Sequence, residues 1–202
     1  MVRKALVLGG LALAIGGGAI DLVAQSTGTP VFQAPYRAFQ RIEFGGTISD
    51  PGYGLAAEGF YRFGQRRWDV GLRGGFHDGR GSDTRLLLGA DFRTRVLDHS
   101  TDFPFDGAFT VGVGGNFGDG RSVMFVPVGI SLGRRVQLED SDVEFVPFVH
   151  PVLVPAFGSG DSDLLFGLGL GIDIAFNRRF ELRVSAGIGD YDGVAVSFAF
   201  TR

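Results

Sequence analysis

Apolar and polar residues alternate along most of the chain after residue 35. The segment 84–96 shows this best, with Leu86 and Phe92 on one parity and Asp91 and Arg93 on the other. Because successive side chains of a strand point to opposite faces, a period of two predicts strands with one apolar and one polar face. Ten segments of 10 to 15 residues carry the pattern: 36–49, 53–63, 67–77, 84–96, 104–117, 122–136, 143–155, 163–176, 179–189 and 192–201. Each is long enough to cross a bilayer as a tilted strand.

The connections between these segments alternate between two chemistries. One set is rich in Gly and Asp, which favour tight turns, and comprises 49–52, 78–83, 118–121, 158–163 and 189–193. The other set comprises 64–67, 97–104, 134–142 and 177–179, and three of its four members carry a pair of arginines. Odd and even connections lie at opposite ends of an up-and-down barrel, so the alternation predicts ten strands, with eight as the alternative. Both termini then lie at the periplasmic end, and the Asp-rich turns face outside.

The two faces of the predicted strands differ sharply in polarity. One face is almost wholly apolar, whereas the other carries charges of both signs, with glycines between them that leave space for long side chains. We therefore predict an all-β fold, a closed antiparallel up-and-down transmembrane β-barrel whose apolar face meets lipid and whose lumen is charged. The predicted lumen-lining charges, which are suited to an ion-pair network, are Arg41, Glu43, Glu58, Arg62, Asp69, Arg73, Arg85, Asp91, Arg93, Arg95, Asp106, Glu144, Asp173, Glu181 and Arg183. A soluble, lipocalin-like barrel with an apolar lumen remains the alternative, because charge patterning alone does not exclude it.

The first residues resemble a processing segment rather than part of the fold. Arg3 and Lys4 precede an apolar stretch, and Ala24 supplies a small residue for cleavage, as in a secretory signal peptide. The apolar stretch of about 16 residues is short for a membrane-spanning helix. We expect a signal peptide at 1–24, a periplasmic lead-in at 25–35 and the barrel at 36–202.

Composition narrows the available chemistry. The chain has no cysteine, which excludes disulfides, zinc–thiolate sites and cysteine nucleophiles. A net charge of −3 offers no electrostatic basis for binding nucleic acid. The 34 glycines argue against a helix-rich protein, since Gly is unfavourable in helix interiors.

The last predicted strand resembles the C-terminal assembly signal of bacterial outer-membrane proteins. Its alternating apolar residues are Val194, Val196, Phe198 and Phe200. The match departs from the usual pattern at the end, because Thr201 and Arg202 follow the final aromatic residue. The chain as a whole, over 36–202, is similar to the small Gram-negative outer-membrane β-barrel family. That resemblance implies an outer-membrane location, contact with membrane lipid and lipopolysaccharide, and assembly through the last strand.

The sequence offers weak signals for catalysis or for a bound group. Its three histidines are His77, His99 and His150, and none has a serine two positions further on, the arrangement of a lipid A deacylase with this fold. The Asp-x-Asp pairs fall in Gly-rich turns and are typical of turn formation rather than metal binding. The Gly-x-Gly runs lie within strands and precede no helix, so they do not indicate a nucleotide loop. We expect no enzyme activity, no cofactor and no metal.

The sixth and seventh predicted strands depart from the general pattern. They place apolar residues on the lumen parity, namely Phe125, Val146, Phe148 and Val152, and they contain several prolines, which lack a backbone donor. One interpretation is a path or pocket for a small hydrophobic ligand. The other is that these residues pack against the lead-in or seal the lumen.

The leading functional hypothesis is a non-enzymatic, monomeric outer-membrane barrel that is structural or passes a small solute passively. Binding or passage of a hydrophobic ligand through strands six and seven is the second hypothesis. A lipid-modifying enzyme is the third. The sequence does not say whether the lumen is open.

Overall fold

The computed structural model describes residues 26–37, 42–52, 54–79, 84–118, 121–138, 141–158 and 160–202. Within these ranges no helix is long and apolar enough to cross a membrane. The predicted signal peptide at 1–24 and the candidate lumen residue Arg41 lie outside the described residues.

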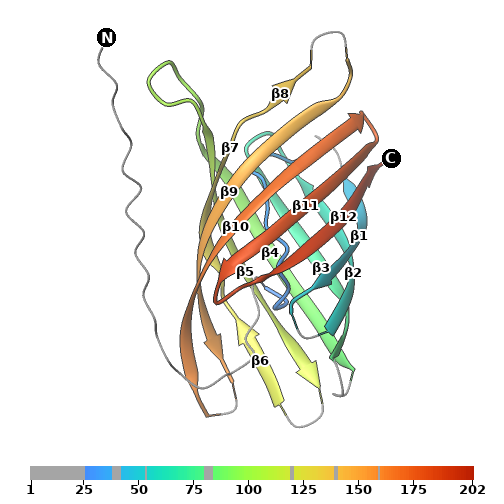
Figure 1. The fold of residues 1–202 in the computed structure, drawn as a ribbon, viewed down its shortest axis with the longest axis vertical. Coiled ribbons are helices and arrows are strands. Elements are labelled where there is room, and N and C mark those ends of the chain that lie inside the picture. Colours follow the sequence, from blue (N-terminus) through green and yellow to red (C-terminus); the bar gives the residue numbers. More distant parts are fainter. Residues whose placement is uncertain are drawn as a thin grey trace, which may run out of the picture.

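The described residues form twelve strands (Figure 1). In chain order they are β1 (Glu43–Asp50), β2 (Gly54–Gly64), β3 (Trp68–Gly79), β4 (Arg85–Leu97), β5 (Asp106–Gly118), β6 (Arg121–Phe125), β7 (Val128–Gly133), β8 (Val136–Gln137), β9 (Glu144–Phe157), β10 (Ser162–Asn177), β11 (Phe180–Gly189) and β12 (Gly193–Thr201). The alternating segments of the sequence therefore become strands, as predicted.

The sheet closes because the last strand pairs with the first. β12 runs antiparallel to β1, from Glu43↔Thr201 to Asp50↔Val194. Each wall strand pairs antiparallel with its neighbours, and β6 and β7 together fill one wall position. In its described residues the wall is thus a closed barrel of ten strands, which confirms the predicted number over the alternative of eight.

Two predicted strands have different boundaries in the structure. The strand expected over 36–49 begins only at Glu43. The strand expected over 122–136 is divided near Pro127, which accepts a hydrogen bond from Gly112 N–H (2.9 Å) but has no N–H to return. The short β8 continues the pairing of this wall position with β9.

The apolar face points outward and the charged face inward. Phe109 and Leu170 are 37% and 43% exposed on the outer surface, whereas Asp91 and Arg93 are 8% and 4% exposed inside. This orientation is the one predicted for a barrel in lipid. It is the reverse of the soluble alternative, which required an apolar lumen.

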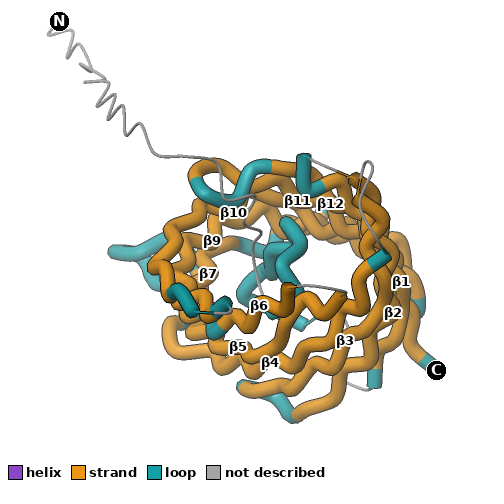
Figure 2. Tube along the Cα trace, turned by 90° about the horizontal axis from the view of Figure 1, so that it is seen from below, coloured by secondary structure: helices purple, strands orange, loops and turns teal. Residues whose placement is uncertain are grey.

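The interior of the barrel is filled by the chain itself. Residues 26–37, called here the lumen segment, run inside the ring of strands as irregular chain (Figure 2). Ser26, Thr27, Thr29 and Phe32 of this segment are buried. The sequence predicts a periplasmic lead-in at 25–35, and the described part of this stretch, residues 26–35, lies inside the ring of strands.

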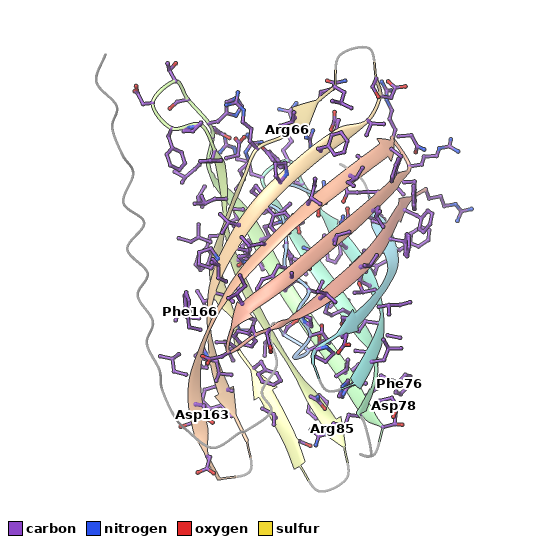
Figure 3. All side chains as sticks on the ribbon, viewed as in Figure 1. Arg66, Phe76, Asp78, Arg85, Asp163 and Phe166 are labelled. Atoms are coloured by element: carbon purple, nitrogen blue, oxygen red, sulfur yellow. The ribbon has the colours of Figure 1, made fainter. Side chains whose placement is uncertain are left out.

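The two ends of the barrel carry different charges. Arg66 lies at one end, in the connection between β2 and β3, while Asp78 and Asp163 lie at the other (Figure 3). The arginine pairs at 134–135 and 178–179 fall in connections on the same side as Arg66. The alternation of connection chemistry seen in the sequence therefore corresponds to the two ends of the barrel.

Candidate functional site

The lumen segment is held by hydrogen bonds to strands on several sides of the barrel. Thr29 Oγ1 donates to Glu58 Oε2 of β2 (2.7 Å), and Gln33 Nε2 donates to Asp91 Oδ1 of β4 (2.9 Å). Arg93 Nη1 donates to the carbonyl of Ala34 (2.5 Å). These contacts reach polar groups of the segment that would otherwise be buried without partners.

The opposite side of the barrel binds the same segment. Ser185 Oγ of β11 donates to the carbonyl of Pro30 (3.0 Å) and accepts from Phe32 N–H (3.3 Å). Ser131 Oγ of β7 donates to the carbonyl of Gln33 (2.5 Å), and Gln33 N–H donates to His150 Nδ1 of β9 (3.3 Å). The segment is therefore tied across the lumen rather than to one wall.

Glycines on the inner face provide the space that the lumen segment occupies. A Cβ added to Gly89 would lie 2.6 Å from Ser26 Oγ, and one added to Gly169 would overlap the ring of Phe32. A Cβ on Gly187 would lie 3.0 Å from the same ring. Glycine marks places where another part of the chain approaches a strand closely. The wall is thus shaped to receive this segment.

The sequence interpretation assigned these glycines to space for long charged side chains. That holds at Gly71, where an added Cβ would lie 2.8 Å from Arg62 Cζ. At Gly89 and Gly169 the space belongs to the lumen segment, whereas the atom nearest to a Cβ added at Gly187 is the backbone carbonyl oxygen of Tyr191. The inward glycines were visible in the sequence, but the part of the chain that occupies the space beside them was not.

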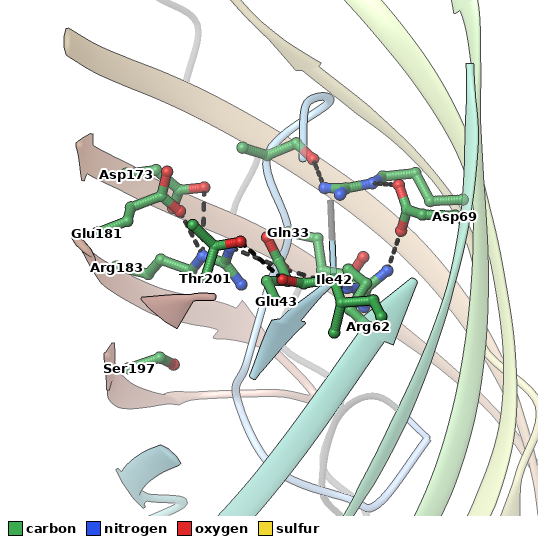
Figure 4. Close-up of polar contacts among 12 residues, drawn as sticks. Gln33, Ile42, Glu43, Arg62, Asp69, Asp173, Glu181, Arg183, Ser197 and Thr201 are labelled. Carbon is green, nitrogen blue, oxygen red and sulfur yellow. Dashed lines mark hydrogen bonds and ion pairs between the residues drawn. The ribbon is translucent and has the colours of Figure 1, made fainter. Parts of the chain in front are cut away.

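A continuous ion-pair network lines the wall from β4 round to β10 (Figure 4). Arg62 contacts Asp69, Asp91 and Glu43, the last at 3.6 Å from Nε to Oε1. Arg93 Nε lies 3.0 Å from Asp69 Oδ2. Because one planar guanidinium can bind several carboxylates, Arg62 of β2 joins its own strand to β1, β3 and β4.

Glu43 extends this network to the other side of the closure between β1 and β12. Its Oε1 accepts from Arg183 Nη2 (2.9 Å), and Arg183 Nε lies 2.6 Å from Glu181 Oε1 and 3.9 Å from Asp173 Oδ2. Three carboxylates thus surround one guanidinium in a buried site. Removing a partner from such a site leaves uncompensated charge.

A second polar cluster surrounds Asp106 near the arginine-bearing end. Asp106 accepts from Arg95 Nη2 (2.6 Å), from His99 N–H (3.1 Å) and from the Tyr36 hydroxyl, and His99 Nδ1 lies 2.8 Å from its Oδ2. The guanidinium of Arg135 lies over the Tyr36 ring, 4.9 Å from its centroid. This cluster fixes the last part of the lumen segment before β1.

The Tyr36 hydroxyl gives the barrel a testable alkaline limit. Burial and the hydrogen bond to Asp106 raise the pKa of Tyr36 to about 12. The neutral phenol is favoured in the folded state, so its stabilisation is complete below pH 10 and is lost as the pH rises toward 12. Tyr36→Phe should lower the free energy of unfolding by about 1.5–3 kcal/mol at pH 8. Between pH 8 and pH 11 the variant should lose less stability than the unmodified protein, because it has no phenol to titrate. Urea midpoints of the folded form at both values measure this.

The control for that measurement is Tyr61→Phe, which changes an exposed tyrosine on the outer face. Its midpoints should follow those of the unmodified protein at both pH values. An equal alkaline loss in Tyr36→Phe and the unmodified protein would show that Tyr36 is not the titrating group.

The remaining predicted lumen charges that the structure describes, Arg73, Arg85 and Glu144, lie on the inner parity. Arg73 Nη1 is 3.8 Å from Glu58 Oε2, and Glu144 Oε2 is 3.2 Å from Arg135 Nε at the rim. Arg85 lies at the opposite rim and is partly exposed. Their positions extend the charged lining toward both ends.

The predicted apolar path forms one buried cluster with the lumen segment. Phe125, Val146, Phe148 and Val152 pack with Phe32 and Ala34, and the cluster also contains Val154, Ala156, Leu165 and Tyr191. This is the packing interpretation raised by the sequence. The lumen is therefore apolar toward β6, β9 and β10 and charged toward β1 to β4.

The other singled-out residues have separate places. His150 Nε2 lies 2.8 Å from Thr110 Oγ1 inside the barrel, while His99 belongs to the Asp106 cluster. His77 is buried on β3. Among the described residues no group of three or more His, Cys, Asp or Glu is arranged to hold a metal ion. The residues Val194, Val196, Phe198 and Phe200 point outward on β12.

The space left beside the lumen segment is small. A cavity of about 20 Å³ is lined by Phe32, Gln33, Arg62, Arg73 and Arg183, among others. Such a volume accommodates roughly one water molecule. Among the described residues, this cavity offers no room for a solute larger than water.

Comparison with known proteins gives no assignment by sequence, because no protein-family model and no curated protein match the chain. Among solved structures, a bacterial polysaccharide outer membrane secretin aligns with a TM-score of 0.46 and 13% identity, over 80% of this chain and 65% of that chain. The chain thus spans less than two thirds of that protein. The β domain of the Bordetella autotransporter BrkA aligns with a TM-score of 0.44 and 12% identity, over 79% of this chain and 98% of that one. These likenesses assign no activity to the chain.

Proposed function

We propose that this protein is a non-enzymatic β-barrel of the Gram-negative outer membrane, closed by its own lumen segment. The outer surface supports a location in lipid, because exposed Leu, Ile, Val and Phe side chains surround the wall. Ring closure leaves no unpaired sheet edge, which a bilayer would not tolerate. The signal peptide expected at 1–24 is consistent with export.

The filled lumen supports a structural role over an open pore. The observation that carries this proposal is the cavity of about 20 Å³ that remains beside the lumen segment. Hydrogen bonds from β2, β4, β7, β9 and β11 hold the segment in place. Passive passage of a solute larger than water would require the lumen segment to move and hydrogen bonds of this set to break.

The proposed partners follow from the outer surface. Membrane lipid and lipopolysaccharide would contact the apolar belt, and the outer-membrane assembly machinery would engage the last strand through its outward Val and Phe residues. We expect a monomer, since β1 and β12 already satisfy one another. We propose no cofactor and no nucleic-acid partner.

Single-channel recording in planar bilayers tests the closed state. The unmodified protein should give no steady conductance, whereas a variant lacking residues 26–36 should give stable conductance steps, because its charged lumen fills with water. Phe44→Ala, which changes an outward side chain, is the control and should stay closed. A steady conductance in the unmodified protein equal to that of the deletion variant would refute the proposal.

The location has its own test. The protein should fractionate with outer membranes and should change its gel mobility on heating, because a folded barrel migrates differently from its unfolded chain. Recovery of the folded protein as a soluble periplasmic species would overturn the membrane assignment independently of the conductance result.

A further inference from the structure

One seam of the barrel wall is weakened by prolines. Of the eight prolines in the sequence, three lie within described strands, and all three are in β9: Pro147, Pro151 and Pro155. They are four residues apart, and β9 pairs with β10 in an unbroken register, so all three have the same parity. In an antiparallel strand, residues of one parity direct both backbone groups to the same neighbour.

The neighbour that loses these donors is the wall position formed by β6 and β7. Val126 N–H donates to the Pro155 carbonyl (3.0 Å), and Arg134 N–H donates to the Pro147 carbonyl (3.4 Å). The missing N–H groups of these prolines therefore also face β6 and β7. The same register places Pro151 opposite Ile130. We call this pairing of β6 and β7 with β9 the proline seam.

The proline seam lacks backbone hydrogen-bond donors that β9 retains on its other side, toward β10. Between residues 147 and 155, β9 directs five backbone positions toward β6 and β7, and three of them are prolines without a donor. The positions directed toward β10 are 146, 148, 150, 152, 154 and 156, and all of these have an N–H. Pro127 lies in the same wall position, but its carbonyl accepts from Gly112 N–H, so its missing donor faces β5. The loss from the three prolines of β9 is concentrated on one line of the wall.

The proline seam is apolar on its outer face and, apart from the buried Ser131 and His150, also on its inner face. On the outside, Met124, Val128, Ile130 and Leu153 are exposed. On the inside, the seam is backed by the cluster of Phe125, Val146, Phe148, Val152 and Val154. Most of the remaining wall has charged side chains on its inner face. An apolar chain entering elsewhere would meet buried charge, whereas here it would meet the apolar cluster and the polar side chains of Ser131 and His150, but no carboxylate or guanidinium.

We infer that the proline seam is a lateral opening through which an acyl chain of a bilayer lipid reaches the apolar cluster of the lumen. A single acyl chain fits this site because it is linear and needs no polar partner. Opening requires fewer backbone bonds to break than at any fully bonded seam. The inference rests on the proposed membrane location and names a ligand class for the apolar side of the lumen.

Hydrogen exchange tests the weakness of the seam in the native chain. The amide of Ile130, opposite Pro151, should exchange about tenfold or more faster than the amide of Gly169, which faces β9 from the β10 side. Pro151→Val restores a donor and should slow exchange at Ile130, whereas Pro104→Val, in a connection, should not. Equal protection of Ile130 and Gly169 in the unmodified protein would overturn the opening.

Fluorescence quenching tests the acyl chain itself. In a Trp68→Phe background, Phe125→Trp places an indole in the apolar cluster, and Leu87→Trp places one inside the barrel on β4. In vesicles of phosphatidylcholine brominated along its chains, the first should be quenched and the second should not. Equal absence of quenching at both positions would refute entry of the chain.

Cross-linking closes the seam without changing the lumen. Val128 and Leu153 are Cα partners across the proline seam, and the chain has no native cysteine, so V128C/L153C should form one disulfide and abolish the quenching. L153C/F166C, across β9 and β10, is the matched control and should leave it unchanged. Quenching that survives the first cross-link would refute the route. Failure of the protein to insert into vesicles would instead refute the membrane location.

Discussion

Arg62→Met is expected to lower the free energy of unfolding by about 3–5 kcal/mol, the largest single-residue effect that the structure predicts. Arg62 is buried and contacts Glu43, Asp69 and Asp91, which are themselves buried. Methionine fills much of the same volume but leaves three carboxylates with fewer partners. Uncompensated buried charge is costly, because neither water nor a counterion reaches it.

The measurement is the urea midpoint of the folded, heat-modifiable form. Arg67→Met is the matched control, since Arg67 pairs with Asp98 at 2.9 Å on the surface, where both side chains are about half exposed. An exposed pair of this kind contributes only about 0–1 kcal/mol. Arg62→Lys should fall between the two, because an ammonium group cannot reproduce the planar contacts of a guanidinium. Equal midpoints for Arg62→Met and Arg67→Met would show that the buried network does not stabilise the barrel.

Gly169→Val is expected to convert the closed barrel into a conducting one. The valine side chain would occupy the place of the Phe32 ring, which an added Cβ at this position already overlaps. The backbone ladder of β10 with β9 and β11 does not depend on that glycine, so the wall should still close. Displacing Phe32 strains its neighbours, because Ser185 and His150 bind the adjoining backbone of the segment.

Planar-bilayer recording gives the result directly. Gly169→Val should show conductance steps like those of the variant without residues 26–36. Gly46→Val is the control, because the nearest atom to an added Cβ at Gly46 is the Glu58 carbonyl oxygen at 3.7 Å, an ordinary contact. It should remain closed and folded. If Gly169→Val folds normally and stays closed, the glycine does not position the segment.

The sequence was sufficient to predict the wall. Alternation fixed the strands and their faces, because a one-residue shift would turn every charged side chain toward lipid. The two alternating kinds of connection supported a count of ten strands and predicted that the two ends of the barrel differ in composition. The boundaries were less accurate at Tyr36 and Pro127, where turn or proline geometry interrupts an apolar pattern that otherwise continues.

The candidate site was predicted only in part. The inward charges could be named from parity, but their pairing could not, since Glu43 and Arg183 are 140 residues apart and meet only when β1 pairs with β12. Arg41 was named with them and lies outside the described residues. The prolines of β9 were visible in the sequence. Only the observed strand pairing shows that the backbone N–H groups they lack would have faced β6 and β7.

The sequence by itself determined a ring of strands with one apolar and one charged face. The alternation that specifies these faces can be recognised within each segment, without knowledge of its neighbours. Only the tertiary structure decided what fills that ring. Residues 26–37 have no periodic pattern, and their contacts reach partners such as Asp91 and Ser185, which are distant in the chain. Such contacts exist only after the wall has closed around them, so no local signal could specify them.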